Sequence, residues 1–282
     1  MTRHASTTAL AVVLAASLAA CADSPTPAPT TTAVLTNARI AEIVSSPDRS
    51  DTDRRNDVRR EPAEMLSFVG VRPGSVALDL SAGGGYTTEL IARAVGPTGR
   101  VYGQSPPPAV RTPPAQSESG AMPAAAASMS ASAPRTTAMA LAARARNPQT
   151  SNIVSVVQPF EAPIPAEVAS NGLDLVTLMF NYHDLGHMGV DRERMNRAVF
   201  SALKPGGHYV IADHSGRPGT GISESGTLHR VEEAFVRSEV EAAGFRLVAT
   251  GGFLRNPADP RDRNVPEPPM PKDEFVLKFV KP

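Results

Sequence analysis

The chain has 282 residues, and its 28 lysine and arginine residues are balanced by 28 aspartate and glutamate residues, so its formal net charge is zero. Only 5% of the residues are aromatic. A neutral chain with few aromatic side chains lacks both the electrostatic field and the stacking surface that favour nucleic acids, so we expect no nucleic-acid partner. The composition gives no indication of an oligomeric state.

The first 20 residues have the pattern of a bacterial secretory signal. Arg3 precedes a mostly apolar run over residues 9–20, which is too short to span a bilayer. The run ends in LAAC, which resembles a lipobox whose cysteine, Cys21, becomes the lipidated N-terminus. Residues 21–32 are rich in proline and threonine, as a stiff, solvated tether is. We therefore predict a signal peptide that ends at residue 20.

These features predict a cell-envelope lipoprotein that faces the periplasm and meets the membrane through its lipid anchor only. Ala22 follows the cysteine directly, so the familiar Asp retention signal is absent from that position and the outer membrane is favoured. Without signal and tether, roughly 250 residues remain, which is ample for one α/β domain. We assign residues 33–282 to that domain.

The domain alternates between helical patterns and short strands rich in Val, Leu and Ile. A charged helix is expected over residues 51–68, broken at Pro62, and two more end before Lys204 and Gly244. Their apolar stripes are Met195, Ala198, Val199 and Ala202, and Val231, Phe235 and Val240. The seven expected strands are residues 75–80, 100–104, 152–158, 173–180, 208–213, 245–250 and 274–280.

This alternation predicts a Rossmann-like, mostly parallel seven-stranded sheet with helices on both faces. The last strand follows another without a clear helix between them, so we expect it to be antiparallel. Residues 105–148 interrupt the pattern with proline, alanine and serine, and only Thr136 to Arg146 has a helical pattern. This insertion either folds over a ligand pocket at the carboxyl edge of the sheet or is a tolerated low-complexity segment.

The first predicted strand carries the most informative motif, VALDLSAGGGYT over residues 76–87. Asp79 comes before the glycines, whereas the acid of a dinucleotide-binding fold lies about 20 residues after them. This order resembles motif I of class I S-adenosylmethionine-dependent methyltransferases, Asp-x-Gly-x-Gly-x-Gly, with Ser81 in place of the first glycine. A tight turn that needs glycine for structural reasons alone is the alternative interpretation.

A second segment, LKPGG over residues 203–207, resembles the stretch before the fifth strand of the same superfamily. The resemblance extends from about residue 40 to residue 282, and it is nearest to predicted bacterial exported methyltransferases with similar NYHDL and ADHSG segments. It implies S-adenosylmethionine as the cofactor. The residues that it places at the cofactor are Asp79, Ser81, Gly83, Gly84, Gly85, Gln104, Phe160, Glu161 and Asn181.

The implied cofactor residues have different roles. Asp79 and the glycine turn hold the methionine end and the sugar against bare backbone, where a Cβ would collide. Gln104 stands where the resemblance implies an acid for the ribose, and the neutral amide gives up roughly 1 kcal/mol. Pro159 replaces a second acid, so Phe160 would stack on adenine and Glu161 would substitute for that acid.

The candidate catalytic residues follow the fourth and fifth strands. His183 or His214 is predicted to act as a general base, because imidazole titrates near neutral pH, and Asp184 to orient a histidine. The alternative is that Asp184 caps a helix and the histidines only bind backbone at the sheet edge. His183 and His187 have a spacing that suits a metal on a helix, but Gly186 and the strand-end position argue against a helix, so no metal is predicted.

Together these features predict an S-adenosylmethionine-dependent methyltransferase that acts on a small molecule not specified by the sequence. Its expected export conflicts with a methyl donor that is made in the cytosol. The alternative function is therefore a non-catalytic envelope lipoprotein that uses a methyltransferase-like fold as a ligand-binding module.

Overall fold

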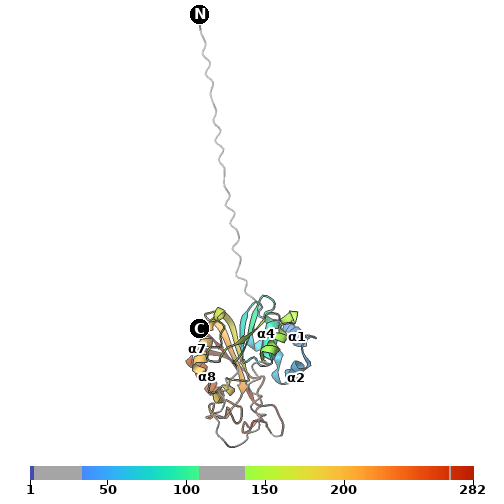
Figure 1. Ribbon diagram of the computed structural model, residues 1–282, viewed down its shortest axis with the longest axis vertical. Helices are drawn as coiled ribbons and strands as arrows, with labels where there is room; N and C mark the ends of the chain where they lie inside the picture. Colours follow the sequence, from blue (N-terminus) through green and yellow to red (C-terminus); the bar gives the residue numbers. More distant parts are fainter. Residues whose placement is uncertain (3–33, 108–136, 267) are drawn as a thin grey trace, which may run out of the picture. The chain divides into compact units, whose positions relative to one another are not determined.

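We describe the chain from a computed structural model, in which residues 1–2, 34–107, 137–266 and 268–282 are described (Figure 1). The predicted signal peptide, Cys21 and its tether, and most of the 105–148 insertion lie outside these residues. Every element below falls in one compact unit, Thr32–Pro282.

The centre of this unit is a seven-stranded sheet with the order β3-β2-β1-β4-β5-β7-β6. β3, β2, β1, β4 and β5 are parallel to one another, whereas β7 is antiparallel to both β5 and β6. The predicted Rossmann-like sheet with an antiparallel last strand is thereby confirmed. The strands are β1 (Val76–Leu80), β2 (Arg100–Ser105), β3 (Ile153–Val157), β4 (Leu173–Met179), β5 (Leu203–His214), β6 (Arg246–Gly251) and β7 (Glu274–Val280).

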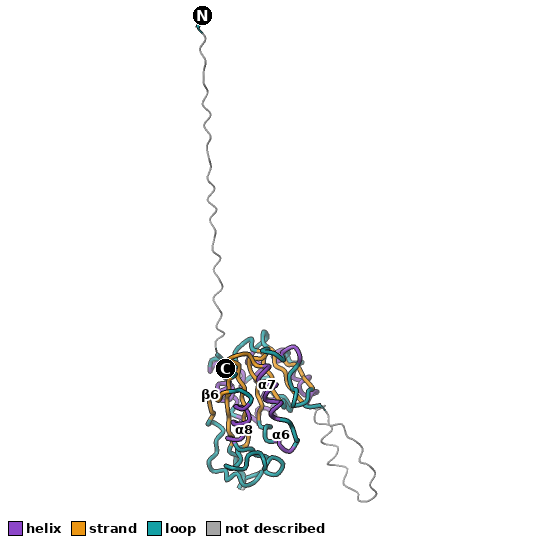
Figure 2. The backbone as a smooth tube through the Cα atoms, turned by 90° about the vertical axis from the view of Figure 1, so that its left-hand side faces the viewer, coloured by secondary structure: helices purple, strands orange, loops and turns teal. Residues whose placement is uncertain are grey.

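Successive residues of a strand point to opposite faces of the sheet, so apolar strand residues need covering on both faces. Helices provide that cover on each face. On β1, Ala77 joins one buried apolar cluster, whereas Leu78 and Leu80 join the other. The first cluster includes side chains of α1 (Asn37–Ser45), α3 (Pro62–Val69) and α4 (Tyr86–Val95), and the second includes those of α7 (Arg192–Ala202) and α8 (Glu233–Ala242). Figure 1 and Figure 2 show α7 and α8 side by side on their face of the sheet.

The charged helix breaks at the predicted proline. α2 (Asp51–Arg60) ends at Glu61, which has a left-handed φ of 43°, and Pro62 begins α3 as its first residue. Proline fits there because the first helical residue needs no backbone hydrogen bond and its φ is already helical. The resulting bend between α2 and α3 leaves α2 beside the carboxyl ends of the strands, where it lines a cavity described below.

Three local features differ from or add to the sequence predictions. β5 begins at Leu203 rather than residue 208, because Leu203 already pairs with Leu173 of β4. A single helical turn, α6 (Asp184–His187), forms where Gly186 argued against a helix, so that expectation is wrong. Gly186 serves close packing instead, since a Cβ there would lie 2.7 Å from Ile222. The remaining short elements are a helix over residues 137–144 and the 3₁₀ turns η1 (Pro148–Thr150) and η2 (Ala166–Val168).

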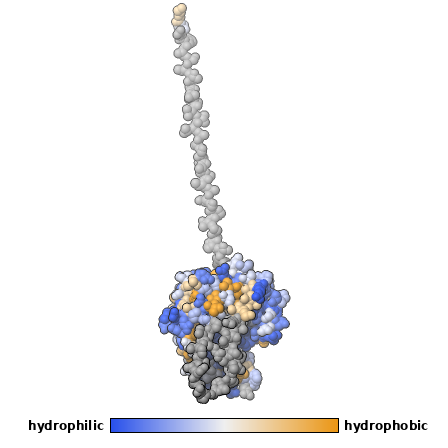
Figure 3. All heavy atoms as spheres, in the orientation of Figure 1, coloured by the Kyte–Doolittle hydropathy of each residue, from blue (hydrophilic) through white to orange (hydrophobic). Residues whose placement is uncertain are grey.

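The face drawn in Figure 3 shows hydrophilic residues over much of the coloured surface, with a smaller hydrophobic area among them. Of the helices that the structure describes, none is both long and apolar enough to cross a membrane.

Candidate functional site

The turn after β1 folds back tightly into α4. Ser81, Gly83 and Gly85 all have left-handed backbone angles, with φ values of 54°, 54° and 81°. Only glycine adopts this region without strain, which explains why the motif that the sequence resembles has glycine at the Ser81 position. The side-chain oxygen of Gln104 accepts a hydrogen bond from the Ser81 backbone at 2.9 Å and so holds the turn in place.

Two cavities adjoin this turn. A cavity of about 490 Å³ is bordered by the turn, the ends of β1 and β4, α2 and the helix over residues 137–144. A smaller cavity of about 170 Å³ lies on the other side of Ser81 and Asn181, toward β2 and Phe160. Of the predicted cofactor residues, the structure places Asp79, Ser81, Gly83, Gly84 and Asn181 at the larger cavity, and Ser81, Gly83, Gln104, Phe160 and Asn181 at the smaller one.

The three glycines of the turn differ in what surrounds them. Gly84 has an ordinary φ and no atom within 4 Å of a built Cβ, because that position faces open space. A Cβ on Gly85 would lie 2.8 Å from the Arg144 side chain and 2.9 Å from Leu141. Gly85 is thus needed for packing of the helix over residues 137–144, whereas Gly84 leaves room in the cavity.

Asp79 is fully enclosed at the end of β1. Its two oxygens accept hydrogen bonds from the hydroxyls of Thr88, at 2.6 Å, and Thr177, at 2.8 Å. Burial raises the pKa of Asp79 to about 6, because desolvation outweighs the two hydroxyls and the nearby Arg60, which lower it. The larger cavity therefore contains a carboxylate that a cationic ligand would help to ionise.

Arg60, at the end of α2, borders the same cavity as Asp79 and lowers the pKa of that carboxyl. A second arginine there, Arg144, pairs with Asp53. The Arg60 guanidinium lies 3.9 Å from the centre of the Phe180 ring, a cation–π contact. Burial, followed by repulsion from Arg59, lowers the pKa of Arg60 to about 10. Arg60 was not among the predicted site residues, because its sequence context shows only a charged surface helix.

Of the residues predicted near ribose and adenine, some border the smaller cavity and one does not. Besides its bond to Ser81, Gln104 donates a hydrogen bond from its amide nitrogen to the Gln158 carbonyl at 2.7 Å, so both ends of the amide hold backbone. Phe160 is buried at the smaller cavity. Glu161 instead accepts a 3.3 Å hydrogen bond from the Asp191 backbone and does not border either of the two cavities as they are described.

The predicted catalytic residues belong to a cluster around α6. His183 is buried, and its Nδ1 lies 2.6 Å from Asp213 Oδ1, while its Nε2 lies 3.1 Å from Asp184 Oδ1. Burial lowers the pKa of His183, but hydrogen bonds to Asp184 and Asp213 outweigh it and raise the pKa to about 9. His183 is therefore held between two carboxylates, which favour its protonated form.

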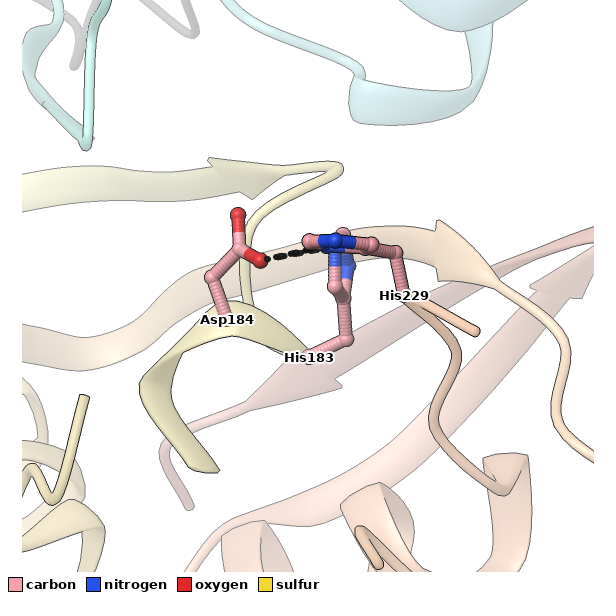
Figure 4. Close-up of side chains that lie close together, drawn as sticks. All are labelled: His183, Asp184 and His229. Carbon is pink, nitrogen blue, oxygen red and sulfur yellow. Dashed lines mark hydrogen bonds and ion pairs between the residues drawn. The ribbon is translucent and has the colours of Figure 1, made fainter. Parts of the chain in front are cut away.

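His229 completes this cluster from a distant part of the chain. Its Nδ1 lies 3.1 Å from the same Asp184 oxygen, and Figure 4 shows the Asp184 carboxylate directed at the two imidazoles. His187 Nδ1 is 3.8 Å from that oxygen and 3.0 Å from the Ser225 hydroxyl. No sequence pattern pointed to His229, because it stands alone in a segment without periodicity.

His214 lies next to the cluster but in a different environment. Its ring centre is 5.3 Å from that of His183, and its Nδ1 is 2.9 Å from Glu274 Oε1 at an angle that does not make a hydrogen bond. Burial lowers the pKa of His214 to about 3. Neither His183 nor His214 is among the described residues that border the two cavities.

A chain of hydrogen bonds joins the glycine turn to the histidine cluster. The Ser81 hydroxyl donates to Asn181 Oδ1 at 2.5 Å, and the Asn181 amide donates to Asp184 Oδ2 at 2.7 Å. Asn181 also borders both cavities. The site thus has two parts, the two cavities beside the turn and a polar cluster, that meet at Asn181.

Comparison with known proteins bears on the fold. No family model matches the chain, and no curated protein matches it either. A SAM-dependent methyltransferase from Aquifex aeolicus superposes with a TM-score of 0.52 at 16% identity, over 88% of this chain and 100% of that one. The [4+2]-cyclase SpnF gives 0.52 at 16% identity, over 79% and 82%.

A chain in the complex of the Haloferax volcanii Trm112 methyltransferase activator gives a TM-score of 0.51 at 17% identity, over 82% of this chain and 93% of that one. These likenesses, with the strand order, show that the chain has the fold of class I SAM-dependent methyltransferases. They do not extend to its activity, since a cyclase shares the same fold.

Proposed function

We propose that the chain is an S-adenosylmethionine-dependent methyltransferase that acts on a small molecule. The observation that carries this proposal is the larger cavity, which joins bare backbone at Gly84 to two opposite charges, Asp79 and Arg60. Such a space suits the amino-acid end of the donor, whose ammonium would pair with Asp79 and whose carboxylate would pair with Arg60. The smaller cavity, with Phe160, would receive the adenosine end.

Methyl transfer from a sulfonium is an in-line displacement, so the protein mainly positions the two reactants and accepts a proton where the acceptor carries one. The histidine cluster is the group of side chains suited to that proton. His214, which lies next to this cluster, is desolvated and a poor proton acceptor, whereas His229 within the cluster is half-exposed and oriented by Asp184. His183 and Asp213 hold Asp184 and α6 in position.

One observation favours the alternative, a non-catalytic binding module of the envelope. Gln104 uses both ends of its amide to hold backbone, so it has less capacity to bind the ribose hydroxyls than a free acid would have. Export to the envelope, which remains our proposal from the sequence, would also separate the chain from the cytosolic donor. This alternative predicts that donor binding is absent or weak.

Calorimetry with S-adenosylmethionine and S-adenosylhomocysteine distinguishes the two. We expect binding by the unmodified chain and its loss in Gly84→Val, whose side chain would enter the cavity without meeting protein atoms. Gly252→Val is the matched control, because Gly252 also has open space around it and an ordinary φ. Absence of binding at millimolar donor, with both variants folded by circular dichroism, would contradict the proposal and support the binding module.

A further inference from the structure

We propose that His183, Asp184 and His229 form a binding site for one divalent transition-metal ion, with zinc as the representative ion. One ligand atom from each of these residues lies within 4.8 Å of the others. The proposal goes beyond methyl transfer, and the site would exist whether or not the chain binds a methyl donor.

The distances suit a shared ion. Asp184 Oδ1 lies 3.1 Å from His183 Nε2 and 3.1 Å from His229 Nδ1. Two ligands that are each about 2.0–2.1 Å from a tetrahedral zinc ion stand roughly 3.3 Å apart. The carboxylate oxygen and each imidazole nitrogen are therefore already near the separation that a common ion requires, and small side-chain rotations would bring both imidazoles to it.

The hydrogen bonds around the cluster also indicate a cation. Asp213 accepts only, so the hydrogen between it and His183 belongs to Nδ1, and in the neutral ring the Nε2 lone pair faces the Asp184 carboxylate. These two electron-rich atoms need a cation between them, which is either the second proton of a charged His183 or a metal ion that takes the place of that proton. The Asp213 carboxylate behind the ring is the arrangement that orients metal-binding histidines in general.

Asp184 is also held by a hydrogen bond in an orientation that suits a metal ligand. Its Oδ2 accepts the Asn181 amide at 2.7 Å, which fixes the carboxylate and leaves Oδ1 directed at the two imidazoles (Figure 4). His183 is nearly fully buried, whereas His229 is half-exposed, so the ion would be reached from the His229 side. The ligands come from two segments that are held together by Ser225, whose hydroxyl donates to the His183 carbonyl at 2.5 Å.

The donor set selects the kind of ion. Two imidazoles and one carboxylate suit zinc and its neighbours among the first-row metals, whereas magnesium and calcium prefer oxygen ligands throughout. His187 Nδ1 is within hydrogen-bonding distance of Ser225, so the protein would supply three ligands and leave a position open. Three protein ligands with an open position are typical of catalytic zinc sites. A bound ion would occupy the Nδ1 lone pair of His229, so His229 acts as the proton acceptor of the proposed function only in the metal-free chain.

The test is a zinc titration of the full-length chain after dialysis against EDTA, followed by calorimetry in the presence of a competing chelator. We expect one zinc ion per chain and no comparable binding of magnesium. His229→Gln and Asp184→Asn should each lower zinc affinity by at least about tenfold, and Asp213→Asn, which acts behind His183, by about 10–100-fold. His208→Gln is the control and should leave the affinity unchanged, because His208 lies at the opposite end of β5 from His214.

His229→Gln alters a half-exposed side chain, so its fold is expected to persist, and circular dichroism without metal verifies this for each variant. Absence of stoichiometric zinc, or zinc binding that is unchanged in folded His229→Gln and Asp184→Asn, would overturn the metal site. Donor calorimetry in EDTA separates the two proposals. Donor binding without any zinc binding refutes the metal site alone, and zinc binding without donor binding refutes the proposed function alone.

Discussion

At the scale of single residues, the burial of Asp79 lowers the free energy of unfolding of the chain at neutral pH and places a carboxylate in the proposed donor site. The raised pKa means that the folded chain binds a proton between about pH 4 and pH 6 that the unfolded chain has released. In that window the unfolded state binds fewer protons, so the free energy of unfolding falls as pH rises, and above pH 6 the full loss is present. The shift from 3.8 to about 6 corresponds to about 3 kcal/mol.

We therefore expect Asp79→Asn to raise the free energy of unfolding of the ligand-free chain at pH 7.5 and to raise it less at pH 4.5. The same variant should bind S-adenosylmethionine more weakly at pH 7.5, because the donor's ammonium loses its partner. Urea unfolding at the two pH values and calorimetry measure these effects, with the exposed Asp262→Asn as a control. An equal stability change at both pH values would contradict the role of the carboxyl charge.

The residues that the sequence could identify are those in a local pattern. Asp79 and Gly83 to Gly85 stand in one short motif, and His183 and Asp184 directly follow a strand, so their neighbourhood follows from chain order. His229 lies 45 residues from Asp184 along the chain, and only the folded loop brings it to that carboxylate. Contacts of this kind depend on tertiary packing, which no periodicity records.

At the scale of elements, Arg144 links three helices beside the ligand cavity through its ion pairs. It is the last residue of the helix over residues 137–144, and it pairs with Asp53 of α2 at 2.7 Å and with Glu89 of α4. Its Nε also donates to the Gly84 carbonyl at 2.7 Å. Asp53 and Glu89 are both buried, so loss of the arginine would leave two carboxylates in a poorly solvated place.

We expect Arg144→Ala to lower the free energy of unfolding by about 2 kcal/mol or more, since breaking a buried ion pair from one side costs about 3–5 kcal/mol and Arg144 is partly exposed. Adding Asp53→Asn should recover part of the loss, and urea unfolding of the double-mutant cycle measures this coupling. Arg39→Ala breaks an exposed pair with Glu42 and is the control, with an expected cost below about 1 kcal/mol. If Arg144→Ala and Asp53→Asn change the free energy of unfolding by strictly additive amounts, the proposed link between the helices is refuted.

Most elements could be predicted because their signals are local. The strands are short β-branched runs, and the break between α2 and α3 follows from the geometry of Pro62. The missed elements depend on partners elsewhere. β5 starts early because Leu203 pairs with Leu173. α6 forms in spite of Gly186, and glycine is required at that position because Ile222 and Ser225 lie too close for any side chain there.

At the scale of the whole molecule, the attachment of the chain to a membrane is a prediction from its sequence. Cys21 is the only cysteine, so a lipid joined through sulfur can be carried at that position alone. We expect labelled palmitate to enter the full-length chain in an expressing bacterium, and the chain to sediment with membranes. Cys21→Ala should lose the label and leave the membrane fraction, because no second thiol can accept the lipid.

Ser17→Ala is the matched control, since it alters the same predicted signal but keeps the cysteine, and it should retain label and location. Label that persists in Cys21→Ala would contradict the lipid anchor. The result also bears on the choice between enzyme and binding module. A lipidated chain that binds the donor in calorimetry needs a source of donor outside the cytosol, whereas an unlipidated chain that stays in the cytosol meets the donor where it is made.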